Sequence, residues 1–193
     1  LTPERVLRQM WALGYRGDVI HYVGMSHYMR LAPVGGALLA GGSGAVVTVP
    51  CAAWHRDMAV RFQAMGLGVI WSISYELLNA YCPEAWKQRD SDGGAALTGW
   101  EPPSTLLSPA HDGAMDWLQR AAREFVAIGV DAGMPLKFQV GEPWWWIAAG
   151  GRICGYDDAT TEALGALSVP IADMREPLDA AQKAMLDGLG ALL

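Results

Sequence analysis

The chain has 193 residues, 52% of them hydrophobic, and a formal net charge of −6. This length is sufficient to bury the core of one domain. The scattered lysines and arginines argue against binding of duplex nucleic acid, which requires a basic face. No apolar run approaches the ~20 residues that cross a bilayer, so we expect no membrane span.

The cysteines and histidines indicate neither a disulfide framework nor a metal site. The three cysteines form no CxxC pair, and the four histidines show no HxH or HExxH spacing. The sequence also lacks a phosphate-binding glycine loop and the GxSxG elbow of serine hydrolases. We therefore expect no metal and no other cofactor. Because the chain begins at Leu1 rather than Met, we expect residues 1–193 to be one domain of a longer protein.

A unit of helix, glycine and hydrophobic strand recurs three times along the chain. The predicted strands cover residues 18–24, 67–75 and 135–141, and each follows a glycine that ends a helix. Apolar strands that alternate with helices pair in parallel. We therefore predict an α/β fold of the (β/α)8 TIM-barrel type in which these strands are parallel and adjacent in order. A whole barrel needs ~250 residues, so we expect the barrel to be incomplete in this chain.

The segments between these units are predicted to be less regular. Residues 32–44 are glycine-rich and nearly featureless, with the composition of a flexible connector at their end, and residues 45–49 favour a short strand. The stretch 77–107 is too rich in Trp and Tyr to be plainly disordered. We expect it to be an ordered loop over the carboxyl ends of the strands. Residues 150–169 show no regular pattern.

Helix starts are marked by capping residues and prolines. Thr2 is the predicted N-cap of the first helix, and Ser108 caps a third helix that begins at Pro109. Pro177 is expected to start the last helix.

Two of the predicted strands run directly into a glutamate. Glu76 follows the second strand, and Glu142 follows the third within the stretch FQVGEPWWW at 138–146. On the rim of a barrel, paired carboxylates are the usual equipment of a glycoside hydrolase, one as proton donor and the other as nucleophile or base. The alternative is that each is a structural acid. We favour catalysis for Glu142 because the tryptophans beside it desolvate it in part, whereas both interpretations stay open for Glu76.

Nine tryptophans are more than a core of this size requires, and rings near loops are suited to stacking on sugars. The candidates for substrate binding are the aromatic and imidazole side chains expected near the rim: Tyr75, Trp86, Trp100, Trp144, Trp145, His21 and His27. Each has an alternative role in the core. We expect at least one of the three consecutive tryptophans to point inward, and a buried tyrosine with a satisfied hydroxyl is the commoner case for Tyr75.

Four longer motifs resemble one known family. They are HYVGMSHY at 21–28, SISYELLNAYCPEAWKQRD at 72–90, ALTGWEPPSTLLSP at 96–109 and FQVGEPWWW at 138–146. Together they are similar to the glycoside-hydrolase-like TIM-barrel domain of prophage and gene-transfer-agent tail proteins of alphaproteobacteria. The similarity covers most of the chain. It implies a polysaccharide or glycan and other tail proteins as partners, and a place in a virion or phage-like tail particle.

The resemblance also implies roles for single residues. The wider hydrolase clan carries its acid/base glutamate after the fourth strand, in an Asn-Glu-Pro context. Gly141-Glu142-Pro143 is similar and puts Glu142 in the acid/base position if residues 45–49 form a strand. Gly141 replaces the asparagine that would bind the sugar's 2-hydroxyl, and this departure weakens the enzymatic implication. No candidate for the seventh strand, which would carry the nucleophile, follows in the chain.

Two hypotheses of different classes therefore follow from the sequence. The first is a glycoside hydrolase-like domain that acts on or binds cell-surface polysaccharide. The alternative is a non-catalytic component of a phage-like tail that binds glycan or serves as a structural part. A third hypothesis, an enzyme of other chemistry that acts on a small molecule, is supported only by the predicted fold.

Overall fold

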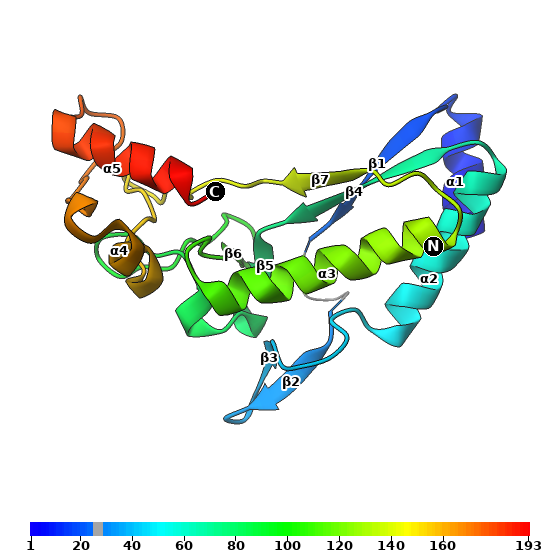
Figure 1. Ribbon diagram of the computed structural model, residues 1–193, viewed down its shortest axis with the longest axis horizontal. Coiled ribbons are helices and arrows are strands. Elements are labelled where there is room, and N and C mark those ends of the chain that lie inside the picture. The colour runs from blue at the N-terminus through cyan, green and yellow to red at the C-terminus, as the bar shows by residue number, and fades with distance from the viewer. Residues whose placement is uncertain (25–28) are drawn as a thin grey trace. The chain divides into compact units, whose positions relative to one another are not determined.

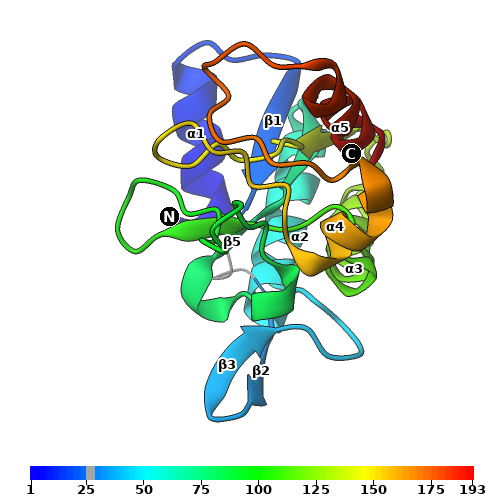
Figure 2. The same ribbon diagram turned by 90° about the vertical axis from the view of Figure 1, so that its left-hand side faces the viewer.

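The computed structural model describes residues 1–24 and 29–193, which form two compact units (Figures 1 and 2). Unit 1 comprises Leu1–Arg30, Gly42–Ser74 and Leu118–Gly141. Unit 2 comprises Leu31–Gly41, Tyr75–Trp117 and Glu142–Leu193. The expectation of one barrel domain over residues 1–193 stays a prediction.

The centre of unit 1 is a parallel sheet in the strand order β1–β4–β7 (Figure 1). The strands are β1 (Asp18–Val23), β4 (Gly68–Ser74) and β7 (Phe138–Gly141), and both pairings are parallel. These are the three strands predicted from the sequence, adjacent in the predicted order, so this part of the fold prediction is confirmed. The parallel sheet of the described residues has three strands and does not close into a barrel.

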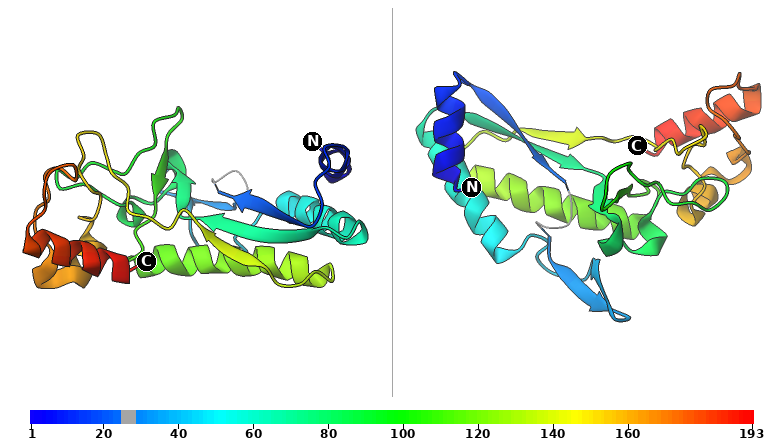
Figure 3. Two further views of the ribbon diagram at one scale, coloured as in Figure 1. Left: turned by 90° about the horizontal axis from the view of Figure 1, so that it is seen from above. Right: turned by 180° about the vertical axis from the view of Figure 1, so that it is seen from behind.

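Helices cover one face of this sheet. Unit 1 contains α1 (Pro3–Ala12), α2 (Val49–Ala64) and most of α3 (Asp112–Asp131). The Phe125 ring of α3 lies 4.9 Å from the His55 ring of α2 and 5.7 Å from the Trp71 ring of β4 (centroid distances), so both helices pack on the same side. Figure 3 shows α3 running along the sheet. Thr2 caps α1 as predicted, because its hydroxyl accepts the N–H of Arg5.

Glycine at position 129 allows α3 to approach the sheet closely. A Cβ on Gly129 would lie 2.6 Å from the indole nitrogen of Trp71, which is closer than atoms of a real side chain come. The large ring of the central strand therefore fits beneath the helix only because position 129 has no side chain. The opposite face of the sheet is more open, since Ile20 and Tyr22 of β1 are exposed.

The predicted flexible connector is held in place by α3. The two terminal nitrogens of Arg120 donate to the carbonyls of Gly44 and Gly42 at 3.0 and 3.1 Å. The Glu124 carboxylate accepts the N–H of Val47 at 2.9 Å. The composition predicted flexibility because the two side chains that fix this segment come from a distant part of the sequence.

Two other predictions before α2 are wrong. The residues expected to be featureless form a hairpin of β2 (Leu31–Val34) and β3 (Ala37–Ala40). The strand expected over 45–49 is reduced to one antiparallel bridge between Met29 and Val47. The extended segment cannot continue beyond Val47, because the Thr48 side chain accepts the N–H of Cys51 and so caps the start of α2.

Unit 2 is built from short strands, single helical turns and loops. β5 (Glu76–Leu78) pairs antiparallel with β6 (Ser104–Leu106), and η2 (Asn79–Tyr81) and η3 (Glu84–Trp86) follow β5 (Figure 2). The stretch 77–107 therefore has structure of its own, as expected. Its place over the carboxyl ends of the parallel strands stays a prediction.

The C-terminal part of unit 2 forms a small apolar core of its own. Its helices are α4 (Asp158–Leu164), η4 (Gly165–Leu167) and α5 (Ala180–Ala191). The side chains buried between them are Ile153, Leu164, Ile171, Met185 and Leu189. None of the helices in the described part of the chain is long and apolar enough to cross a membrane.

Three helix starts differ from the sequence prediction. Helix α4 lies where no regular pattern was expected, although its signals are present: Asp157 accepts the N–H of Thr160, and Gly165 follows the last turn. Helix α5 begins after a capping box at Asp179, beyond the proline that was expected to start it. Helix α3 begins at Asp112, because the predicted cap Ser108 instead pairs its hydroxyl with that of Thr160 at 3.1 Å.

His21 of β1 and His55 of α2 meet in the aromatic core of unit 1. Their Nε2 atoms are 2.9 Å apart, and His55 Nδ1 lies 2.7 Å from the carbonyl oxygen of Cys51, one helical turn earlier. Since Nδ1 donates to that carbonyl, His55 Nε2 accepts from His21, and both rings are neutral. Burial, and secondarily the proximity of His55, lowers the pKa of His21 to about 4. Burial also lowers the pKa of His55.

We expect unit 1 to lose stability as the pH falls from 7 towards 4. The unfolded chain takes up a proton at His21 near pH 6.5, whereas the folded chain does so only near pH 4, so acid favours unfolding in this window. The loss from this group approaches roughly 3 kcal/mol. Urea unfolding at pH 7.5 and pH 4.5, followed by tryptophan fluorescence, measures it.

The substitution His21→Gln keeps a donor for His55 but cannot titrate, so it should flatten this part of the pH dependence. His111→Gln, at a half-buried histidine of unit 2, should keep the wild-type slope. An equally steep slope in His21→Gln and the wild type would contradict the assignment.

Candidate functional site

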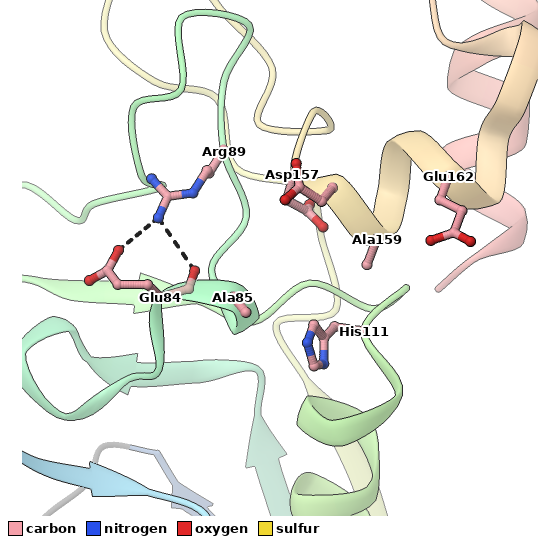
Figure 4. Close-up of a pocket in the computed structure, with 8 residues that line it drawn as sticks. Glu84, Ala85, Arg89, His111, Asp157, Ala159 and Glu162 are labelled. Atoms are coloured by element: carbon pink, nitrogen blue, oxygen red, sulfur yellow. Dashed lines mark hydrogen bonds and ion pairs between the residues drawn. The ribbon is translucent and has the colours of Figure 1, made fainter. Parts of the chain in front are cut away.

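Unit 2 contains a charged pocket of about 500 Å³ (Figure 4). It is lined by residues of η3 and the segment after it, by the residue before α3, and by α4 and its N-cap: Glu84, Ala85, Arg89, His111, Asp157, Asp158, Ala159 and Glu162. Acidic side chains predominate in this lining, so any chemistry here depends on how its carboxylates are already engaged.

On the η3 side of the pocket, Glu84 is held by two basic side chains. Arg89 donates to its Oε2 at 2.7 Å, and the ammonium of the buried Lys87 contacts its Oε1 (Figure 4 draws the Arg89 bonds). The hydrogen bond from Lys87 lowers the pKa of Glu84, and the one from Arg89 adds to the effect. A carboxyl group that is held ionised in this way is a poor proton donor near neutral pH.

On the other side, two lining residues serve helix ends. The buried carboxylate of Asp157 accepts the N–H of Thr160 at 3.1 Å and its hydroxyl at 2.8 Å, which fixes the start of α4. His111 Nδ1 accepts the N–H of Ala114 at 3.3 Å in the first turn of α3. The buried polar groups of the pocket are therefore engaged in structural bonds.

The two glutamates predicted to be catalytic lie in unit 2, outside the lining of this pocket. Glu76 is 5% exposed and begins β5, in register with Leu106 of β6. Glu142 is half-buried and has φ +53°, an uncommon backbone conformation for a residue other than glycine. Arg152 donates to Asp90 at 2.9 Å.

The other predicted rim residues are divided between the units. Tyr75 is buried beside Glu76, its carbonyl accepts the N–H of Leu107 at 2.8 Å, and burial raises its pKa. His21 belongs to the histidine pair of unit 1. His27 lies outside the described residues.

The predicted sugar-binding tryptophans have different environments. Trp145 packs on the C-terminal apolar core, and its indole N–H donates to the carbonyl of Leu189 at 2.9 Å. Trp86 is half-buried, and its ring lies 5.9 Å from that of Trp117. Trp100 and Trp144 are exposed. Of the four predicted tryptophans, only these last two are exposed, at 50% and 45%, so the surface available for stacking is smaller than the sequence predicts.

Gln88, for which the sequence predicted no role, holds the segment of three consecutive tryptophans, residues 144–146. Its side chain is fully buried. Its amide Nε2 donates to the carbonyls of Leu107 and Trp144, both at 3.1 Å, and its Oε1 accepts the N–H of Trp146 at 2.9 Å. One side chain therefore satisfies three main-chain groups from two separate segments. A buried glutamine in a polar motif gives no sequence signal of this role.

Residues 86–90, which we call the central run, extend this arrangement along the main chain. The N–H of Gln88 donates to Leu106, and its carbonyl accepts the N–H of Ala96 at 2.9 Å. The carbonyl of Arg89 accepts the N–H of Tyr156, also at 2.9 Å. The central run thus joins the β5–β6 region to the segment that follows Glu142.

Comparison with known proteins identifies one family. The family model that describes the TIM barrel of non-contractile tail sheath proteins matches residues 1–193. Among solved structures, a point mutant of the protein Kfla1895 aligns with 15% sequence identity and a TM-score of 0.49, over 100% of this chain and 28% of that chain. No curated protein sequence matches. The family match supports the TIM-barrel and phage-tail parts of the resemblance, and it does not extend to glycoside-hydrolase character.

Replacement of Gln88 by leucine should destabilise unit 2 by roughly 3 kcal/mol or more. Three main-chain groups, one in a buried and two in part-buried hydrogen bonds, would lose their partner, and each unsatisfied buried group costs ~1–3 kcal/mol. Urea unfolding monitored by tryptophan fluorescence measures the loss. Gln63→Leu, at an exposed position of α2, is the matched control and should change stability little. Equal unfolding midpoints for the two variants would show that Gln88 has no such role.

Proposed function

The chain belongs to the TIM-barrel family of non-contractile tail sheath proteins, and on this basis we propose that it is a non-catalytic structural domain of a phage-like tail. Its partners are other tail proteins. The observation that carries the proposal is the family match, which extends over residues 1–193.

The use of charged groups in unit 2 supports a structural role. The negative charge of Glu84 is balanced by ion pairs with Lys87 and Arg89, and Asp157 caps helix α4. A hydrolase needs one carboxyl group that can give up a proton and a second that faces the substrate. In this pocket, the carboxylates of Glu84 and Asp157 are instead engaged in ion pairs and hydrogen bonds within unit 2.

The exposed rings of unit 2 are suited to contacts between proteins. Trp100 and Trp144 are exposed together with Leu97. Tryptophan is enriched at protein interfaces, where its large rigid ring contributes much contact area. The same rings that the sequence suggested for sugar stacking therefore serve equally as contact points for neighbouring tail subunits.

Glycoside hydrolysis ranks second, and one observation favours it. The positive φ of Glu142 is the kind of backbone strain that is concentrated at functional sites. The burial of its proposed partner Glu76 opposes it, because a nucleophile or base must reach the sugar.

The substitution Glu142→Gln in the full-length protein separates the two functions. If the domain is structural, particles that carry the variant should form in normal number and deliver nucleic acid with unchanged efficiency per particle. Electron microscopy counts the particles, and a transfer or infection assay measures delivery. Loss of a general acid costs ~10²–10⁴-fold in rate. A loss of delivery on that scale by well-formed variant particles, together with glycan cleavage by the wild type, would establish the hydrolase instead.

A further inference from the structure

The hairpin of β2 and β3, residues 31–40, forms an arm of unit 2. Its two-residue turn consists of Gly35 and Gly36, with φ +57° and +86°, the positive values that a tight hairpin turn requires. At the base of the arm Ala40 is buried and β3 lies against η2. At the tip, Val34 and Leu38 are 55% and 53% exposed. The base of the arm therefore contacts the rest of unit 2, whereas the apolar side chains of its tip are exposed to solvent.

Both faces of the arm are apolar. The register pairs Pro33 with Leu38 on one face and Val34 with Ala37 on the other. An antiparallel hairpin that rests on its own domain normally has one polar face towards water. Pro33 also lacks an N–H, so strand addition along β2 is disfavoured. Contact through the side chains of the tip is the interaction that remains.

The charge distribution indicates what covers the tip. Residues 31–55 are the longest stretch of the chain without Asp, Glu, Lys or Arg. Each copy carries a formal net charge of −6, so two copies repel one another over most of their surface. An uncharged tip is a place where two such copies can touch without bringing carboxylates together.

We propose that the arm docks by its tip on a second copy of this chain. The proposal rests on the proposed function, because a sheath is built from contacts between tail subunits. A head-to-tail contact of this kind generates rings or helical arrays, whereas a symmetric arm-to-arm contact would stop at dimers. One arm is small beside the ~1,200–2,000 Å² of a stable interface, so the contact acts through repetition along the tail.

Photo-crosslinking in assembled particles identifies the occupant. Leu38 is replaced by the photoreactive amino acid p-benzoylphenylalanine in the full-length protein, and purified tail particles are irradiated and analysed by mass spectrometry. The matched control places the same amino acid at Val60 of α2, which is 55% exposed, like Val34 of the arm. We expect position 38 to crosslink to a second copy of the chain at least tenfold more than position 60 does.

A crosslink from position 38 to a different tail protein, or yields equal to those at position 60, would overturn the proposal. Either result leaves the proposed function standing, since the protein is then present in the particle. Absence of the wild-type protein from purified tails would instead refute the proposed function. As a second variant, Val34→Asp with Leu38→Asp should reduce incorporation into particles at least tenfold, whereas Val60→Asp should not. Normal incorporation of the double variant would also count against the arm.

Discussion

The side-chain amide of Gln88 is the interaction on which unit 2 most depends. Its fully buried side chain satisfies main-chain groups of Leu107, Trp144 and Trp146. Unit 2 has short strands and few long ladders, so its backbone needs side chains to complete the hydrogen bonding that a regular sheet would provide. Both oxygen and nitrogen of the amide are used, which makes glutamine difficult to replace.

Several other buried polar side chains of unit 2 have the same role of completing hydrogen bonds of the main chain and of neighbouring loops. Asp90 receives the N–H groups of Asp92 and Gly94 as well as Arg152, while Asp157 and Ser108 meet at Thr160. These are the residue types that would attract attention as catalytic groups in a sequence. Here their lone pairs and protons are committed to holding loops in place. A domain that must keep its shape within an assembly has more use for such bonds than for a reactive carboxylate.

The parts of the fold that could be predicted from the sequence are those with a local cause. The strands at 18–24, 67–75 and 135–141 are apolar runs, each after a glycine that ends a helix, and both pairings between them are parallel as expected. The hairpin at 31–40 was missed because glycine content indicated flexibility, and the contacts that anchor it come from elsewhere in the chain.

The candidate site could be predicted less well, because its determinants are long-range. Gln88 donates hydrogen bonds to the carbonyls of residues 19 and 56 positions away in the sequence. The indole N–H of Trp145 likewise donates to the carbonyl of Leu189 in α5, 44 positions further on. A strand-end position suggested that Glu76 faces a rim, whereas pairing of β5 with β6 accompanies its burial. Periodicity and spacing describe which face of an element is apolar, and they do not say which distant main-chain group a polar side chain will satisfy.

The copy number of the protein in purified tail particles tests the central claim most directly. A structural sheath domain has to cover the tail along its length, so quantitative mass spectrometry against the major tail protein should find many copies per particle, in a number that increases with tail length. A single ring or a few copies, constant whatever the length of the tail, would place the domain at the tip and contradict a sheath.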